Sequence, residues 1–202
     1  MRKVILGLAV AFGLAGMLPG SGLAEELKTG GLMGERVQGK MDAPVTMFEF
    51  SSLTCPHCAT FHEETLPTIK AKYIDTGKVR LVMRDFPFDR VGLTAAIAAR
   101  CVDEKRYFGL IDVLFKQQRR WASDKDPIAA IGRLTRLAGL SQKAFQACLA
   151  NEELANSILA RRIDAQKDYK VNSTPTFVIN GEVISGAQPF EVFEKAIESA
   201  LK

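Results

Sequence analysis

The sequence predicts an α/β fold with a mixed central β-sheet, helices on its faces and an inserted helical domain. Three observations predict it: a strand–helix–strand pattern over residues 45–84, a helix-rich block over residues 91–169, and a β-hairpin followed by a helix at the end of the chain. Parallel strands need a crossover connection and a hairpin joins antiparallel strands, so one sheet that contains both is mixed.

The first pattern begins at Val45–Phe50, an apolar, β-prone run typical of a buried strand. Pro56 suits the first position of a helix that runs toward Tyr73, and Pro67 inside that span should kink or interrupt it. Apolar and basic residues then alternate over Lys78–Arg84, which predicts a second strand. The two strands should pair in parallel through a right-handed crossover.

The middle block has the spacing of several amphipathic helices and little strand character. Asp126 before a proline and Ser141 are expected helix starts, and Gly139 an expected stop. Two short β-prone segments then flank Asn180-Gly181, a strong hairpin signal, and a last helix follows. We expect residues 89–165 to form the helical insertion, and residues 25–88 and 166–202 to form the sheet-containing domain.

Residues 1–24 have the pattern of a secretory signal peptide. Arg2 and Lys3 supply the positive start, an apolar run covers residues 4–18, and Ala24 ends a small-residue cleavage site. A membrane anchor is the alternative, but the run is shorter than the roughly 20 residues that span a bilayer. We expect cleavage after Ala24 and export to the periplasm, an oxidising compartment in which thiols tend to pair.

Composition excludes several classes of protein. Hydrophobic residues make up 47% and charged residues 25%, which is ordinary for a soluble globular chain and argues against disorder, a coiled coil or a multi-span membrane protein. A net charge of +4 is too small to indicate a nucleic-acid partner, and none is expected. The four cysteines are the feature that needs an explanation.

Two of these cysteines belong to Cys55-Pro56-His57-Cys58, which follows one strand and opens a helix. In that position C-x-x-C indicates a redox motif, because the N-terminus of a helix stabilises the thiolate of its first cysteine. A protonated His57 would add positive charge beside this sulfur. Stabilising the thiolate stabilises the reduced form, and such a couple is an oxidant.

Other uses of this motif fit less well. A zinc site needs about four ligands, usually from two such pairs, so no metal is expected. Covalent haem needs a histidine where Ala59 stands, and no cofactor is expected. A purely structural bridge between Cys55 and Cys58 would close almost no loop and contribute little stability.

These segments in this order, with Thr174-Pro175 before the hairpin, resemble the DsbA family of exported thiol:disulfide oxidoreductases over nearly all of the chain after residue 24. The resemblance implies a thioredoxin fold interrupted by a helical domain. It implies that Cys55 is the exposed nucleophile, that Cys58 is the buried resolving thiol, and that Pro175 is a cis-proline beside them whose neighbouring backbone binds substrate. The alternative is an ordinary trans Pro175.

Glu49 lies six residues before Cys55, where oxidants of this family have a buried acid. We expect it to relay the proton of Cys58; an exposed, inactive Glu49 is the alternative. His62, one turn beyond Cys58, is expected to be a surface residue rather than a catalyst. Trp121 suits either the core or a binding surface.

Cys101 and Cys148 are 47 positions apart in the helical block. Export favours their pairing in a structural disulfide, as in some relatives of the family, whereas two free buried thiols are the alternative. Such a bridge would stabilise the fold by roughly 4 kcal/mol.

The expected function is a periplasmic protein-disulfide oxidase that donates the Cys55–Cys58 disulfide to exported, unfolded, cysteine-containing proteins. The resemblance implies reoxidation by a DsbB-type membrane partner, and we expect a monomer. A disulfide isomerase or reductase is the main alternative, because Thr174 replaces the valine of some oxidases and threonine also occurs there in isomerases. A thiol-dependent chaperone is the third.

Overall fold

A computed structural model describes residues 29–202, so the predicted signal peptide lies outside the described residues. The core is a five-stranded sheet in the order β1-β3-β2-β4-β5. β2 and β3 are parallel, and the other neighbours are antiparallel. The predicted mixed sheet is therefore confirmed. Its strands are β1 (Arg36–Gln38), β2 (Val45–Ser51), β3 (Val79–Asp85), β4 (Thr176–Ile179) and β5 (Glu182–Ser185).

Strand β2 is central, and its side chains alternate between two cores because successive residues of a strand point to opposite faces. Met47 packs with Phe61, Phe177 and others in the core on one face. Phe50 packs on the other face in a smaller cluster with Val178 and others. This alternation places Glu49 on the same face as Met47, in a wholly buried position.

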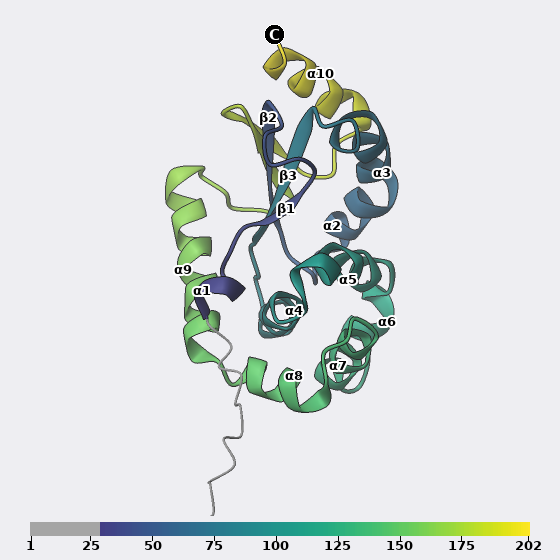
Figure 1. The fold of residues 1–202 in the computed structure, drawn as a ribbon, viewed down its shortest axis with the longest axis vertical. Helices are drawn as coiled ribbons and strands as arrows, with labels where there is room; N and C mark the ends of the chain where they lie inside the picture. The colour runs from purple at the N-terminus through teal and green to yellow at the C-terminus, as the bar shows by residue number, and fades with distance from the viewer. Residues whose placement is uncertain (1–28) are drawn as a thin grey trace, which may run out of the picture.

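Helices cover both faces of the sheet (Figure 1). One long helix follows β2 and comprises α2 (Pro56–Thr60), η1 (Phe61–Thr65), α3 (Leu66–Ile69) and η2 (Lys70–Ile74). Its α3 segment packs beside α10 (Phe190–Ala200). The opposite face is covered by α9 (Glu152–Asp168), which packs on β3 and crosses the expected boundary at residue 165.

The helical insertion packs around α4, below the sheet in Figure 1. Asp89, Asp126 and Ser141 cap three of its helices with their side chains, as the sequence predicted for the last two. Gly139 has φ +87° at the predicted stop. The remaining helices are α1 (Thr29–Leu32), α4 (Arg90–Arg100), α5 (Glu104–Lys116), α6 (Gln118–Ala122), α7 (Pro127–Leu137) and α8 (Gln142–Leu149).

Two features differ from the sequence-based expectations. Edge strand β1 was not predicted, because three residues are too short to show an alternating pattern. The helix is not interrupted at Pro67; the turn before it widens into a π-helix in which the Leu66 N–H donates to the Phe61 carbonyl. Within residues 29–202, none of the helices combines the length and the apolar character that crossing a membrane requires.

Candidate active site

Cys55 and Cys58 lie at the start of α2, and both are free thiols. Cys55 occupies the N-cap position: its N–H donates to the Ser52 carbonyl at 3.0 Å, and its carbonyl accepts from the N–H groups of Cys58 and Ala59 at 3.1 and 3.3 Å. The side chain of Cys55 is partly exposed, whereas Cys58 is 0% exposed. A reagent in solution therefore reaches Cys55 first.

The surroundings of Cys55 lower its pKa from 9.0 to about 5. The largest cause is a hydrogen bond from the Cys58 thiol, and partial burial opposes it. The Thr174 side chain and the backbone N–H groups of Cys58 and His57 lower this pKa further. The N–H groups at a helix start are unsatisfied and favour an anion. Cys55 is accordingly a thiolate at neutral pH.

Cys58 is shifted in the opposite direction. Burial raises the pKa of its thiol above the usual range, and the hydrogen bond to Cys55 and the charge of Cys55 raise it further. Hydrogen bonds from the Ser51 side chain and the Ser52 backbone offset part of this effect. The pair therefore consists of a thiolate and a thiol that holds its proton, which is the asymmetry that thiol–disulfide exchange uses.

Thr174 and Pro175 lie directly against this pair. The Thr174–Pro175 peptide bond is cis, and both residues are buried. In its protonated form Cys55 donates from Sγ to the Thr174 carbonyl oxygen at 3.2 Å, across 119 positions of sequence. The two motifs named from the sequence thus meet at one site, with exposed Pro56 and His57 at its rim.

The loop before Cys55 is held by residues that sequence reasoning missed. Gln118, at the start of α6, donates from Nε2 to the carbonyls of Leu53 and Cys55, both at 2.9 Å. Thr54 donates to Asp89 at 2.6 Å. Asp89 could have been found as a candidate N-cap residue of the following helix, whereas no local sequence signal marks Gln118. The insertion thereby fixes the position of the reactive cysteine.

The expectation for His62 is wrong. Its side chain is buried, and Nε2 lies 2.9 Å from Oε1 of Glu49. The sequence suggested a surface residue because it shows only that His62 is one turn past Cys58; α5 covers that helix face, and the Phe115 ring lies 4.2 Å from the imidazole. Glu49 is 0% exposed, which excludes the alternative that this side chain lies on an exposed face of the strand.

Trp121 belongs to the core: it is 2% exposed, and its indole N–H donates to the Leu114 carbonyl at 2.7 Å. Cys101, at the end of α4, is joined by a disulfide to Cys148 of α8, with Cα atoms 6.3 Å apart. This bridge ties two helices of the insertion together.

Among residues 29–202 there is no group of three or more side chains suited to hold a metal ion.

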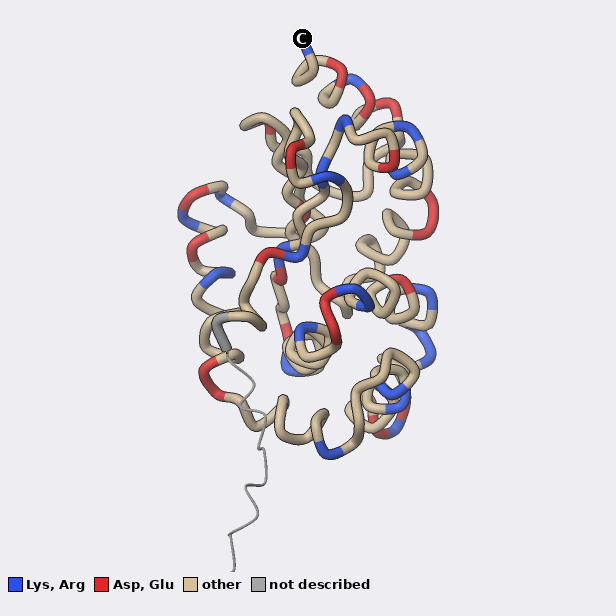
Figure 2. Tube along the Cα trace, in the orientation of Figure 1, with Lys and Arg blue, Asp and Glu red and all other residues tan. Residues whose placement is uncertain are grey.

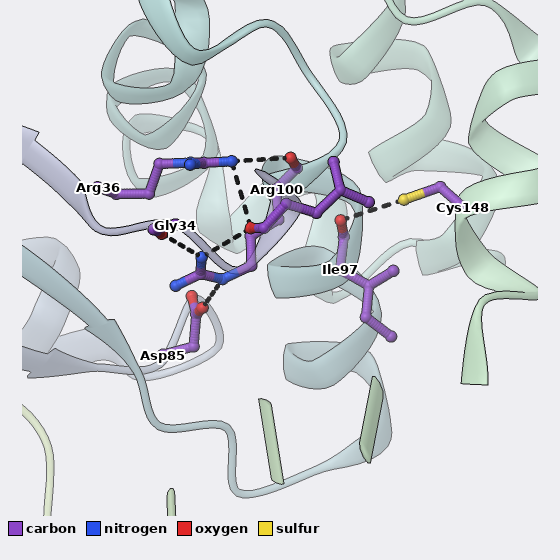
Figure 3. Close-up of polar contacts among 7 residues, drawn as sticks. Gly34, Arg36, Asp85, Ile97, Arg100 and Cys148 are labelled. Carbon is purple, nitrogen blue, oxygen red and sulfur yellow. Dashed lines mark hydrogen bonds and ion pairs between the residues drawn. The ribbon is translucent and has the colours of Figure 1, made fainter. Parts of the chain in front are cut away.

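A buried ion pair connects the insertion to the sheet (Figure 3). Arg100 of α4 donates to Asp85, which lies beside Ser51 in the β2–β3 register. Arg100 also donates to the carbonyls of Leu32 and Gly34 at 3.0 and 3.1 Å. The insertion is thus anchored at the end of the sheet that leads into the cysteine loop.

Comparisons with known proteins agree with this geometry. A family model described as thioredoxin matches residues 32–199. A Rickettsia bellii protein, named as a protein-disulfide oxidoreductase, is 32% identical over 148 residues, 73% of this chain and 57% of the relative. Disulfide bond formation protein D of Bacillus subtilis is 27% identical over 176 residues, 85% of this chain and 79% of the relative. This chain therefore spans less than two thirds of the Rickettsia protein.

Comparison with solved structures also shows similarity to proteins of disulfide exchange. The crystal structure of Wolbachia pipientis α-DsbA1 superposes with a TM-score of 0.78 at 29% identity, covering 84% of this chain and 92% of that chain. That of Bacillus subtilis BdbD superposes with a TM-score of 0.72 at 25% identity, covering 83% and 92%. On its cysteine pair, its fold and these similarities, the chain belongs to the DsbA family of thiol:disulfide oxidoreductases within the thioredoxin superfamily.

Proposed function

We propose that this chain is an exported protein-disulfide oxidase that donates a Cys55–Cys58 disulfide to protein substrates. The observation that carries the proposal is the contrast between the two cysteines: Cys55 is partly exposed at the start of α2, whereas Cys58 is 0% exposed, and these surroundings lower the pKa of Cys55 to about 5 and raise that of Cys58. A stabilised Cys55 thiolate favours the reduced form of the pair, so the oxidised form tends to pass its disulfide on.

The reaction begins when a substrate thiolate attacks Sγ of Cys55 in the oxidised protein. The Cys55–Cys58 bond breaks, Cys58 leaves with the electron pair, and a mixed disulfide joins Cys55 to the substrate. A second substrate thiolate then attacks the substrate sulfur, and Cys55 leaves as a thiolate. The substrate is oxidised by two electrons, and the protein is reduced. Cys55 is the better leaving group because a thiol of lower pKa leaves faster.

Cys58 takes up a proton as it leaves, because burial disfavours its anion. Glu49 is the residue we assign to this transfer. It is buried on the strand that leads to the cysteine loop, and its Oε2 atom has no hydrogen-bond partner among the described residues. Its role is to give the proton to Cys58 in one direction and to accept it in the other.

The substrate side of the site combines backbone groups with basic side chains. The Thr174–Pro175 segment offers main-chain groups beside Cys55, suited to an extended peptide. A groove of about 450 Å³ lies next to Pro56 and is lined in part by Lys116, Arg119 and Arg120. Figure 2 shows basic residues at the end of α5 and along α6. We propose unfolded, cysteine-containing exported proteins as substrates.

Residues 1–24 support export to the periplasm, and a DsbB-type membrane protein would reoxidise the pair. The protein would act as a monomer. One observation favours a second candidate function, disulfide isomerisation: Thr174 precedes the cis-proline, and a structure described as a protein-disulfide isomerase from Novosphingobium aromaticivorans superposes with a TM-score of 0.71 at 26% identity.

Two substrates separate these functions. The oxidised protein is mixed with a reduced two-cysteine peptide and, separately, with scrambled ribonuclease, with the Cys55→Ser variant as the control. The proposal predicts rapid peptide oxidation and little unscrambling. Unscrambling that exceeds peptide oxidation would establish the isomerase instead. Activity with neither substrate would overturn both and leave a thiol-dependent chaperone.

A further inference from the structure

His62 lies between two carboxylates that differ in exposure. Its Nε2 atom is 2.9 Å from Oε1 of Glu49, whose side chain is 0% exposed. Its Nδ1 atom is 4.0 Å from Oδ1 of Asp112 on α5, whose side chain is 53% exposed. The three side chains therefore form a series from the interior to the protein surface.

The outer end of this series opens into a cavity of about 410 Å³. The titratable groups that face His62 there come from two elements: Asp112 and Lys116 from α5, and Glu63 and Lys70 from the helix of His62 itself. Glu49 of β2 faces it from the interior. His62 lines this cavity, but its Nδ1 atom is buried and has no hydrogen-bond partner among the described residues, so Asp112 is the member of the series that solvent reaches.

The inner end of the series lies on the face of β2 that leads to the resolving cysteine: Ser51 follows Glu49 by two residues on that face, and its hydroxyl is close enough to Cys58 to lower the pKa of that thiol. His62 follows Cys58 by four residues, so both side chains lie on the same face of the helix. Cys58 is 0% exposed and cannot exchange its proton directly with bulk water. Glu49 Oε2 is buried and unpaired, so it is free to accept a proton.

We propose that His62 and Asp112 form the path by which the proton of Cys58 leaves the buried site. The inference rests on the proposed function, with Glu49 as the first acceptor. When the Cys58 thiol attacks a mixed disulfide at Cys55, the Cys58–Cys55 bond forms and the outgoing thiolate takes the electron pair. The Cys58 proton passes to Glu49, and the imidazolium of His62 releases its Nδ1 proton toward Asp112 and solvent.

This route keeps the charge of the buried pair constant. Before the step, His62 is positive and Glu49 negative; afterwards both are neutral. Burial alone would lower the pKa of His62, but the charge of Glu49, the nearby carboxylate of Asp112 and the hydrogen bond with Glu49 outweigh burial and raise it to about 9. His62 is therefore charged at neutral pH and pairs with Oε1 of Glu49, which leaves Oε2 as the atom available for proton transfer.

The test follows the reduced protein as it reacts with oxidised glutathione at a series of pH values. Cys55 forms a mixed disulfide with glutathione, Cys58 then resolves it, and mass spectrometry of acid-quenched samples measures both steps. In His62→Gln, Glu49 loses the imidazolium beside it, and the path loses the group that releases a proton toward Asp112. We expect the midpoint of the resolution step to rise by about one pH unit or more, with the mixed disulfide accumulating at neutral pH.

Three variants control this result. His62→Lys keeps a positive charge beside Glu49 and should return the midpoint toward that of the wild type. Asp112→Asn alters only a half-exposed side chain and should shift the midpoint upward by less than His62→Gln. Glu63→Gln removes a carboxylate that lines the same cavity without pairing with His62, and it should leave the profile unchanged.

A wild-type profile in His62→Gln overturns the proposal. If this variant folds incompletely, a wild-type profile in Asp112→Asn overturns it equally. Failure of the proposed function has a different signature: the unmodified protein would not oxidise the reduced peptide, while the glutathione profiles of all variants would still be measurable. A slower first step in His62→Gln, without a change in the pH dependence of the second, would indicate a purely structural role and also contradict the proposal.

Discussion

The bridge between Cys101 and Cys148 gives a stability prediction of defined size. It joins the end of α4 to α8 across 47 positions. Closing a loop of this length in the unfolded chain corresponds to about 4 kcal/mol in the chain-entropy account. Replacing both cysteines by alanine avoids a free thiol, and it should lower the free energy of unfolding by about that amount. For a domain of this size, we expect a fall in Tm of about 8–16 °C.

Urea unfolding of the double variant and the wild type, with and without a strong reductant, measures this difference. Reductant should bring the wild type down to the stability of the variant and leave the variant itself nearly unchanged. The reasoning is refuted if the variant without reductant lies within about 1 kcal/mol of the wild type, because the bridge then does not restrict the unfolded chain as calculated.

Three further predictions concern the site and its supports. Arg100→Met leaves Asp85 as an unpaired buried anion, and urea unfolding should show a loss of about 3–5 kcal/mol; Asp85→Asn in the same chain should recover part of it. Gln118→Ala leaves the Leu53 carbonyl without its side-chain donor and removes one of the donors to the Cys55 carbonyl; amide hydrogen exchange in that loop should accelerate, and a loss of about 1–3 kcal/mol in the free energy of unfolding is expected. Thiolate absorbance of Cys55 should titrate with a midpoint of about 5, and the stability that this thiolate adds to the reduced form should be complete above the thiol's ordinary pKa of 9.0 and disappear as the pH falls through about 5. A thiolate titration of Cys55 with a midpoint near 9.0 would contradict the lowered pKa assigned to this thiol.

Much of the fold was predictable from the sequence because its signals are local. The hairpin depends on Asn180-Gly181, where both residues have positive φ, +47° and +84°. The caps at Asp126 and Ser141 depend on side chains that bond to the next turn. The position of the cysteine motif at the start of a helix was predictable too, because the strand, the loop and the helix follow one another directly in the sequence.

Long-range contacts were not predictable from a single sequence. His62 looks like a surface residue until α5 is placed over it, with Phe115 lying 53 residues later in the chain. Gln118 holds the cysteine loop from 63 positions away, and nothing in its neighbours marks that role. Arg100 follows an apolar run and Asp85 ends β3, and only their ion pair shows why two buried charged residues are tolerated there.

The equilibrium of the Cys55–Cys58 pair with glutathione tests the central claim most directly. The claim is that a stabilised Cys55 thiolate makes the disulfide a strong oxidant. In glutathione mixtures poised at about −200 mV, typical of an oxidising folding compartment, the account predicts that the pair is almost entirely in the dithiol form. A pair that remains mostly disulfide in those mixtures would contradict the account.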